Sequence, residues 1–455
     1  MLSKKYILTV SVFLLLLLQS NFAQGRVDEV ASPASIKLNR QRGLSMLDDI
    51  KEVVKSRYFD KNYRGMNLDE KFKAAAEKIR TLDTNRQIFR VLAQVLLDFN
   101  DSHTRFYPPR RANQVEYGFT MQMIGNNCFV VDVKKGSDAE AKNLKTGDII
   151  VAIGNFATSR QNLWKMNYLL YALDPQESLK LYVLNPDRTE REIEVKATFK
   201  SIEDRQKEAA KRRREKSENP YKCQAINAET IACKLRTFSV DKKYVDKMMS
   251  EVGTHKKMIL DLRGNGGGYV TTEEHLTGYF FDRDVKVADF VMRDKTKERI
   301  AKSQKGKVYK GELIVLIDSN SASASEIFSR VVQLEKRGKV VGDVSAGAVM
   351  TSIFIPMANT RGTPGFETYS LFSLNLTVAD LIMSDGKRLE GVGVIPDYPL
   401  GPTGKALFEK SDPILAYSAG LLGAKITEKD AGKFYFLAAK AEDEETEENT
   451  EEKDN

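Results

Sequence analysis

Two short motifs in this chain combine residue types that could carry out acyl transfer. The first is Asp-Leu-Arg-Gly-Asn-Gly-Gly-Gly at 261–268, and the second is Ser-Ala-Ser-Ala-Ser-Glu at 321–326. Each follows an apolar, strand-like stretch, and the second opens an apolar helix. A glycine turn lets another atom approach its backbone N–H groups closely. A serine between a strand and a helix has an exposed oxygen beside a helix N-terminus, which favours developing negative charge. Together the motifs predict an activated serine nucleophile.

Three serines compete for that role. Ser321 could cap the helix, and Ser325 falls within its first turn. Ser323 stands between two alanines that leave room for a substrate, so it is the predicted nucleophile, although spacing alone favours it only slightly. Because a serine alkoxide is scarcely present at neutral pH, this residue needs a base, and the base usually needs an orienting partner.

The segments before these motifs predict two further domains. Residues 36–112 form an N-terminal helical domain, in which Thr84 and Gln87 make a capping box ahead of an apolar helical face. Residues 113–200 form a β-rich domain with one amphipathic helix at 163–173. A charged helical linker at 201–220 then leads to residues 221–425. Here the predicted strands (221–226, 230–236, 257–262, 312–318, 338–342 and 352–356) alternate with predicted helices (240–252, 272–282 and 324–335). This alternation predicts an α/β domain with a largely parallel sheet.

The β-rich domain resembles the PDZ domains of exported proteases. The pattern Gly-Ser-x-Ala-x-x-x-x-Leu-x-x-Gly-Asp at 136–148 carries this resemblance. It implies a peptide-binding loop formed by Tyr117, Gly118 and Phe119, whose backbone N–H groups could receive a peptide C-terminus. The peptide would add a strand to a sheet edge. The alternative is that this PDZ-like domain serves only as a rigid spacer.

The catalytic motifs resemble those of the serine peptidases that include the C-terminal processing proteases and the tricorn core proteases. The two motifs above are followed by Glu-Gly-x-Gly-Val-x-Pro-Asp at 390–397, and the likeness extends from about residue 40 to 425. The resemblance implies a crotonase/ClpP-like spiral ββα catalytic domain, joined to an N-terminal helical region and the PDZ-like domain. It also implies that the middle serine of the run, Ser323, attacks the peptide bond.

One departure from the family pattern affects the choice of base. The processing proteases carry a lysine in a Gly-Lys-Gly turn after the serine, whereas this chain has Ala348 in that place. The tricorn branch instead uses a Ser-His pair from a preceding segment and a late glutamate. The matching residues here are Ser102, His103 and Glu390. We therefore expect His103 to deprotonate Ser323, with an imidazole that titrates near neutrality, and Ser102 and Glu390 to orient it. His275 is a reserve candidate.

Backbone N–H groups should form the oxyanion hole, because they stabilise the tetrahedral intermediate without reorganisation. Ala324 follows the nucleophile directly, and Gly267 is the second donor by resemblance. Arg263 and Asn265 are expected to brace the glycine turn. We expect no cofactor, because the glycine run lacks a complete phosphate-binding motif. We also expect no metal, because the three histidines and three cysteines lack zinc-ligand spacing.

The two ends of the chain indicate where the protein works. Residues 1–23 have the form of a secretory signal peptide, with two lysines before an apolar run, although a retained N-terminal anchor is the alternative. No later segment is long and apolar enough to span a membrane. The segment 426–455 ends in an acidic tail that should be disordered. An exported, periplasmic or extracellular location permits disulfides, and Cys223 and Cys233 could face each other across a hairpin.

The formal net charge of +8 raises the question of nucleic-acid binding. The densest basic run, at 211–214, has no interleaved aromatic residue and is better explained as a solvated helix, so no nucleic-acid partner is expected. We predict an exported serine endopeptidase that acts on protein or peptide substrates through an acyl-enzyme on Ser323. A catalytically inactive PDZ-containing scaffold is the alternative, motivated by the missing lysine. The sequence leaves the oligomeric state open.

Overall fold

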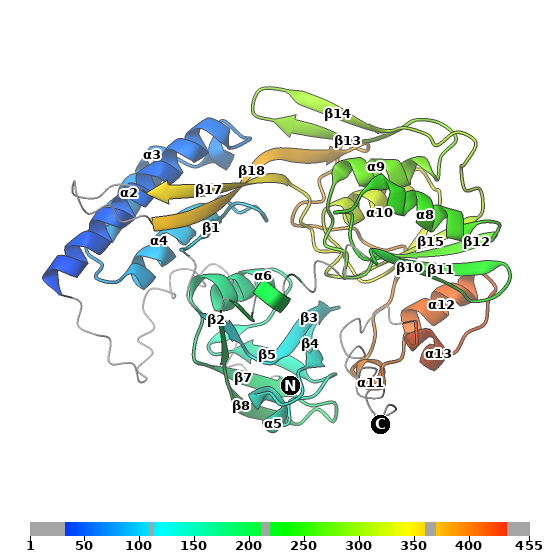
Figure 1. The fold of residues 1–455 in the computed structure, drawn as a ribbon, viewed down its shortest axis with the longest axis horizontal. Coiled ribbons are helices and arrows are strands. Elements are labelled where there is room, and N and C mark those ends of the chain that lie inside the picture. The colour runs from blue at the N-terminus through cyan, green and yellow to red at the C-terminus, as the bar shows by residue number, and fades with distance from the viewer. Residues whose placement is uncertain are drawn as a thin grey trace, which may run out of the picture.

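The computed structural model describes residues 32–109, 113–201, 203–204, 206–208, 210, 219–359 and 370–434. The expected signal peptide and acidic tail lie outside these residues, as does the basic run at 211–214. Residue 201, which was expected to begin the helical linker, instead ends a strand. The described part of the chain contains helices and sheets in the arrangement of an α/β protein, which confirms the predicted class (Figure 1).

The N-terminal region contains three helices, α2 (Pro33–Arg57), α3 (Leu68–Ile79) and α4 (Asn85–Leu97), and a short turn of 3₁₀ helix, η3 (Tyr63–Gly65). The predicted capping box is present at the start of α4, where Thr84 and Gln87 satisfy each other's backbone N–H groups. The apolar face of α4 is buried, with Ile88 and Leu92 fully inaccessible to solvent. These helices do not form a complete hydrophobic core by themselves.

The partner of the helices is a sheet whose strands come mostly from the far end of the chain. Its order is β1 (Arg105–Tyr107), β18 (Ser370–Met383), β13 (Val285–Met292) and β14 (Thr296–Ala301), and β17 (Thr351–Asn359) also pairs with β18. Leu374 and Leu376 of β18 are fully buried among the residues of α2, α3 and α4. Figure 1 shows β17 and β18 lying along these helices. The sequence predicted only a short strand at 352–356 here, because a partner so distant in sequence leaves no local signal.

The PDZ-like region forms a sheet in the order β3 (Phe119–Ile124), β4 (Asn127–Val133), β5 (Ile149–Ile153), β7 (Ser178–Leu184) and β8 (Glu190–Lys196), with β6 (Phe156–Ala157) beside β5. A short helix, α5 (Asp138–Ala141), follows β4. The expected helix at 163–173 consists of α6 (Leu163–Asn167) and a π-helical turn, η4 (Tyr168–Leu173). Strands β2 (Asn113–Glu116) and β9 (Thr198–Ser201) pair with each other and bring the two ends of this region together.

The third region contains the predicted, largely parallel sheet. Its order is β10 (Tyr221–Ala225), β11 (Thr230–Leu235), β12 (Lys257–Asp261), β15 (Glu312–Ile317), β16 (Lys339–Gly342) and β19 (Tyr398–Pro399). Only the β10–β11 pair is antiparallel. Helices α8 (Lys242–Val252), α9 (Val270–Gly278) and α10 (Ala324–Leu334) cover one face, and α12 (Pro413–Leu421) and α13 (Glu428–Gly432) the other, preceded by α11 (Gly404–Phe408) (Figure 1).

Two of the three cysteines form a disulfide. Cys223 on β10 lies directly opposite Cys233 on β11, and the structure joins them across a Cα–Cα distance of 4.1 Å. Cys128 is a buried free thiol in β4. The bond therefore links the antiparallel edge strand to the parallel sheet.

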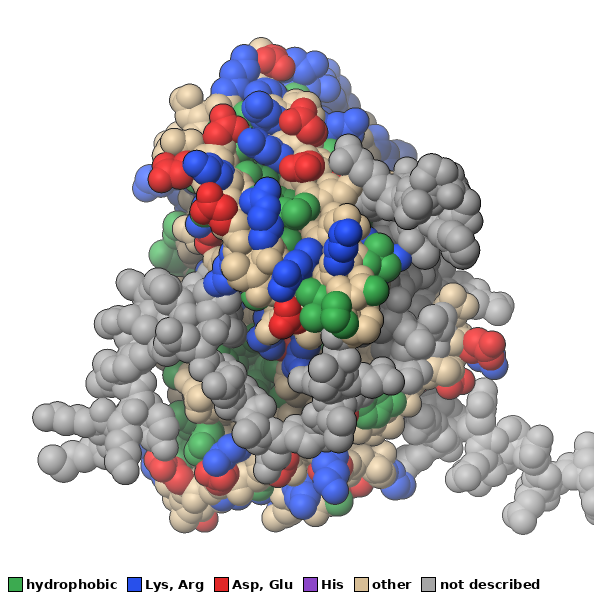
Figure 2. Space-filling model, turned by 90° about the vertical axis from the view of Figure 1, so that its left-hand side faces the viewer, with side chains coloured by type: hydrophobic (Ala, Val, Ile, Leu, Met, Phe, Trp, Pro, Cys, Tyr) green, Lys and Arg blue, Asp and Glu red, His purple; other side chains and the backbone are tan. Residues whose placement is uncertain are grey.

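Charged side chains of both signs are mixed on the face that carries α2, α3 and α4. Figure 2 shows Lys and Arg interspersed with Asp and Glu over the upper part of this face. Several of them form ion pairs, such as Arg40 with Asp83 at 2.8 Å and Lys51 with Asp69 at 2.7 Å. No helix in the described part of the chain is both long and apolar enough to cross a membrane.

Candidate active site

The backbone at Ser323 distinguishes this residue from its two neighbouring serines. Ser323 precedes α10 with φ +54° and ψ −117°, a conformation that non-glycine residues rarely adopt and that costs on the order of 1–3 kcal/mol. Ser321 and Ser325 are fully buried, and their hydroxyls donate to the carbonyl oxygens of Leu262 and Asn265 at 2.9 and 2.8 Å. Only the Ser323 hydroxyl belongs to a partly exposed residue. Such a strained turn from a strand to a helix is typical of a nucleophilic serine.

The glycine turn after β12 packs directly against Ser323. A Cβ atom placed on Gly267 (φ +93°) would lie 2.7 Å from the Cβ of Ser323, so only glycine fits there. Asn265 braces the turn, because its side-chain oxygen accepts the Gly267 N–H at 2.9 Å and its backbone oxygen accepts the N–H of Ala322 at 3.0 Å. The Gly267 N–H is therefore engaged in this conformation. The N–H of Ala324, the first residue of α10, has no partner in the described part of the chain.

The turn that carries His103 is held by a buried aspartate. The Asp101 carboxylate, 4% exposed, accepts hydrogen bonds from the backbone N–H groups of His103 and Thr104 at 3.0 and 2.6 Å. It also accepts the hydroxyls of Tyr58 at 2.9 Å and Thr377 at 2.9 Å. These bonds attach the turn both to Tyr58, the C-cap residue of α2, and to β18. This role of Asp101 was not predicted from the sequence, although the residue opens the Asp-Ser-His-Thr run.

Glu390 reaches this turn from 288 residues further along the chain. Its carboxylate accepts the backbone N–H of Ser102 at 2.7 Å and the Ser102 hydroxyl at 3.0 Å. The same hydroxyl lies 2.6 Å from Nδ1 of His103. The structure thus brings together three of the four residues expected to carry the chemistry. In the described part of the chain, Nε2 of His103 has no hydrogen-bond partner, so it is the nitrogen that remains for a substrate or nucleophile.

A short loop connects this group to Ser323. The Ser323 N–H donates to the carbonyl oxygen of Ala348 at 3.0 Å, and the next N–H along the chain, that of Val349, donates to Glu390 at 3.1 Å. The backbone of Ala348, the residue at the position where a lysine was expected by resemblance, therefore contacts the backbone of Ser323. Among the described residues, no hydrogen bond joins His103 to Ser323 directly. Hydrogen bonds between a nucleophile and its base are often long in ligand-free enzymes and shorten when substrate binds.

The protonation states of this group are set mainly by burial. Burial lowers the pKa of His103 to about 4; Arg105 lowers it further, whereas Asp101 opposes the shift. The expectation of an imidazole titrating near neutrality is therefore not met, because that value belongs to a hydrated ring. Burial also raises the pKa of Glu390, although the hydrogen bonds from Ser102 and Val349 counter this effect. At neutral pH the imidazole is uncharged and able to accept a proton.

Two family models match this sequence. The model of peptidase family S41 matches residues 232–400, and the PDZ domain model matches residues 116–197. The chain thus contains an S41 peptidase region and a PDZ domain. The predicted family of serine peptidases with a PDZ domain is thereby confirmed.

Two curated relatives illustrate this similarity. The chain is 28% identical over 268 residues to the tail-specific protease of Haemophilus influenzae, covering 54% of this chain and 36% of that protein. It is 22% identical over 374 residues to the chloroplastic C-terminal processing peptidase of Tetradesmus obliquus, covering 77% of this chain and 75% of that protein. The chain thus spans only about a third of the length of the first relative.

Solved structures show the same fold. Mature CPAF complexed with lactacystin superposes with a TM-score of 0.62 at 14% identity, covering 88% of this chain and 99% of that one. The photosystem II D1 C-terminal processing protease gives a TM-score of 0.52 at 18% identity, covering 86% and 98%. Because the identities are low, these comparisons establish the architecture and not the chemistry.

The predicted peptide-binding loop of the PDZ domain leads into an edge strand. Gly118 has φ +71°, and Phe119 begins β3, which among the described strands has a neighbour only on the β4 side. The Tyr117 side chain is buried, and its hydroxyl bonds to the backbone of Gln176 at 3.0 Å. The Tyr117 ring therefore belongs to the core, and the Gly118 carbonyl oxygen already accepts the N–H of Lys134 at 2.9 Å.

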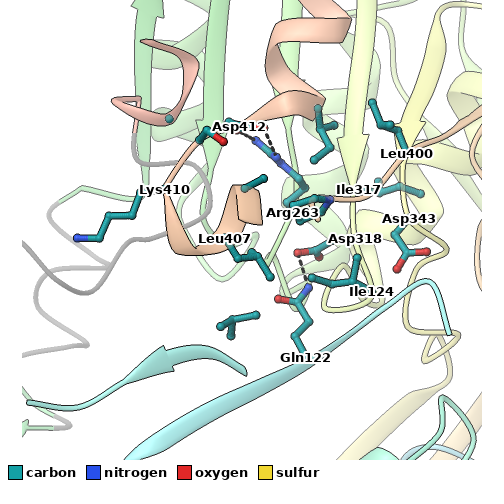
Figure 3. Close-up of a pocket in the computed structure, with 16 residues that line it drawn as sticks. Gln122, Ile124, Arg263, Ile317, Asp318, Asp343, Leu400, Leu407, Lys410 and Asp412 are labelled. Carbon is teal, nitrogen blue, oxygen red and sulfur yellow. Dashed lines mark hydrogen bonds and ion pairs between the residues drawn. The ribbon is translucent and has the colours of Figure 1, made fainter. Parts of the chain in front are cut away.

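The PDZ domain contacts the S41 domain close to the site. Gln122 on β3 donates to Asp318 at 2.9 Å, and Arg160 pairs with Asp343 at the start of the loop that holds Ala348. A cavity of about 60 Å³ lies between β3, β4 and the C-terminal helices, and Figure 3 shows Gln122 and Asp318 in its wall. Arg263 and Asp412, which form an ion pair, also line this cavity.

The other histidines lie in different surroundings. Nε2 of His275 contacts Asp246 of α8 at 2.7 Å, and Nδ1 of His255 lies 2.8 Å from the carbonyl oxygen of Val252. Neither hydrogen-bonds to a serine of the 321–326 motif in the described chain. Among the described residues there is also no group of three His, Cys, Asp or Glu side chains that could hold a metal ion.

Proposed function

We propose that this protein is a serine endopeptidase that hydrolyses peptide bonds through an acyl-enzyme on Ser323, with His103 as general base. The observation that carries the proposal is the hydrogen-bonded group of Glu390, Ser102 and His103, which the 348–349 backbone connects to Ser323. Because Nδ1 of His103 faces Ser102, Nε2 is left to take the proton of the nucleophile.

The reaction would proceed in two halves. Oγ of Ser323 attacks the carbonyl carbon while its proton passes to Nε2 of His103, and His103 then donates this proton to the leaving amine. Water, deprotonated by the same nitrogen, hydrolyses the acyl-enzyme and releases Ser323. Ser102 and Glu390 would hold the ring in the required tautomer and orientation.

The oxyanion of the tetrahedral intermediate needs backbone donors. We assign one to Ala324, whose N–H has no partner in the described chain and lies at the N-terminus of α10. Gly267 is proposed as the second donor, and its N–H would have to exchange the side-chain oxygen of Asn265 for the substrate oxygen. Gly267 also provides the space into which the scissile carbonyl can move.

The PDZ domain is proposed to bind unstructured or C-terminal peptide segments as an added strand on β3 and to present them to the site. Export to the periplasm or the extracellular space is proposed from residues 1–23. The disulfide between Cys223 and Cys233 supports this location, because disulfides persist in oxidising compartments.

The test is to incubate the purified protein with casein and with a serine-directed phosphonate probe. We expect Ser323→Ala to abolish labelling, and both Ser323→Ala and His103→Ala to lower kcat by about 10⁴-fold or more. Ser56→Ala and His275→Ala are matched controls that should retain wild-type turnover. Labelling that persists in Ser323→Ala would refute the assignment of the nucleophile. Saturable peptide binding without cleavage by the wild type would instead identify a silent scaffold.

A further inference from the structure

Glu326 ends the Ser-Ala-Ser-Ala-Ser-Glu motif and has no part in the relay described above. It is the third residue of α10, and its side chain is completely buried. A buried carboxylate is unfavourable unless it is well hydrogen-bonded. The contacts of Glu326 therefore indicate why the chain keeps a charge at this position.

Four donors surround this carboxylate, two at each oxygen. Oε1 accepts the hydroxyl of Ser345 at 2.6 Å and the N–H of Gly347 at 2.7 Å. Oε2 accepts the N–H of Ala348 at 2.9 Å and the N–H of Ser323 itself at 3.0 Å. Only an ionised carboxylate can accept from all four donors at once, because a proton on either oxygen would point at one of them.

No basic side chain in the described part of the chain forms an ion pair with Glu326. The negative charge is stabilised by these four donors and by its place in the first turn of α10. Burial outweighs these effects and raises the pKa of Glu326 to about 7. The carboxylate is therefore only partly ionised at neutral pH, and its four hydrogen bonds depend on pH in that range.

The contacts extend from Glu326 to the segment that carries Glu390. Ser345 accepts the N–H of Val394 at 2.6 Å with the same hydroxyl oxygen that donates to Glu326. The carbonyl oxygen of Gly347 accepts the N–H of Gly391 at 2.8 Å. One carboxylate thus connects the strained backbone of Ser323 to the 345–349 loop, and that loop contacts Glu390 itself and residues that follow it.

We propose that Glu326 is the positioning residue of this active site: its ionised carboxylate holds Ser323 in its strained conformation and fixes the 345–349 loop, and with it Glu390, relative to the nucleophile. The inference rests on the proposed function, because it takes Ser323 as the nucleophile. Glu326 touches no reacting atom in this account and acts only through the groups that it orients.

The test compares Glu326→Gln with the wild-type protein and with the control Glu335→Gln. Glutamine has the same shape, but in either orientation its NH₂ group faces at least one backbone N–H, which cannot accept a hydrogen bond. We expect kcat to fall on the order of 10- to 100-fold with KM nearly unchanged. Glu335 lies at the other end of α10 and pairs with Arg283 on the surface, so its replacement should change neither constant.

The pH profile separates positioning from a general loss of stability. In the wild type, kcat should fall as the pH drops through about 7, because Glu326 becomes protonated, and this limb should be absent in Glu326→Gln. Asp101, Glu390 and His103 are the other titratable groups of the site. A limb near pH 7 that persists in Glu326→Gln would belong to one of them and would overturn the proposal.

Two further measurements keep the outcome decisive. If Glu326→Gln does not fold, Ser345→Ala removes only one of the four donors and should lower kcat about tenfold; wild-type kcat and pH profile in that variant would refute the inference. If the wild type shows no turnover, the proposed function fails. Amide hydrogen exchange then tests separately whether Glu326 fixes the 345–349 loop. Exchange at 345–349 and 389–394 should quicken in Glu326→Gln but not in Glu335→Gln, and unchanged exchange would overturn the inference.

Discussion

The ion pair between Arg263 and Asp412 should be a large local contribution to the stability of the S41 domain. Arg263 belongs to the glycine motif, Asp412 precedes α12, and their side chains are each 2% exposed. The guanidinium donates to both oxygens of Asp412, at 3.0 and 2.7 Å, and to both oxygens of Asp261, at 3.0 and 2.7 Å. Figure 3 shows the bond between Arg263 and Asp412 at the wall of the cavity.

Replacing Asp412 by Asn removes the charge while retaining the shape and the N-cap. The Asp412 carboxylate also accepts the Leu415 N–H at 3.0 Å, and asparagine caps helices about as well as aspartate. Arg263 would then keep only Asp261 of its two carboxylate partners, and it would share Asp261 with the buried Lys234. Breaking one partner of a buried pair costs about 3 kcal/mol or more. For a unit of roughly 200 residues, this loss lowers Tm by about 6–12 °C.

Calorimetry of the wild-type, Asp412→Asn and Asp412→Ala proteins measures the Tm of each and so tests the contribution of the ion pair to stability. Asp412→Ala should lose about 1 kcal/mol more than Asp412→Asn, because it also removes the cap. Glu409→Gln is the matched control, since its partner Lys405 lies 3.7 Å away in an exposed pair, and its Tm should not change. The reasoning is refuted if Asp412→Asn unfolds within about 1 °C of the wild type, because the pair would then contribute nothing net.

Two further predictions concern the site and the compartment. Burial lowers the pKa of His103 to about 4. In Glu326→Gln, kcat/KM should therefore fall on the acid side only near pH 4, where His103 becomes protonated. A fall near pH 6.5 would show that the imidazole ring is hydrated. The same shift affects the free energy of unfolding. As the pH falls, His103 is protonated in the unfolded chain before it is protonated in the folded protein, so stability is lost between about pH 6.5 and pH 4. If the protein is exported, the mass of the natural product should lack residues 1–23, and thiol alkylation without reductant should leave Cys223 and Cys233 unmodified. Reduction should lower stability by about 2–3 kcal/mol, and labelling of both cysteines in unreduced protein would contradict the bond.

Local patterns in the sequence predicted most of the elements around the site. The strands before the glycine turn and before Ser323 are short apolar runs, and the helix after Ser323 has a continuous apolar face, so each is visible within a few residues. The capping box at Thr84 is equally local. By contrast, β1, β13, β14 and the long β18 were not predicted, because their pairing partners lie far away in the sequence.

The choice of Ser323 among three serines likewise depended partly on local sequence and partly on tertiary structure. The motif established that a serine follows the strand, but spacing favoured Ser323 only slightly. Backbone strain and the buried hydrogen bonds of Ser321 and Ser325 are tertiary properties, and they make the distinction. The roles of Asp101 and Glu326 were missed for the same reason. In the sequence each is an ordinary acidic residue, and its role is visible only from the hydrogen-bond donors that the fold brings to its carboxylate.

The sequence by itself determined the residue types available for chemistry: a serine at the start of a helix, a glycine turn, a histidine and a late glutamate, with no lysine at position 348. Only the tertiary structure decided that Ser102 and Glu390, 288 positions apart, share a hydrogen bond, and that burial keeps His103 uncharged. The physical reason is that periodicity and turn chemistry act between near neighbours, whereas desolvation and hydrogen bonding depend on which distant segments the fold packs together.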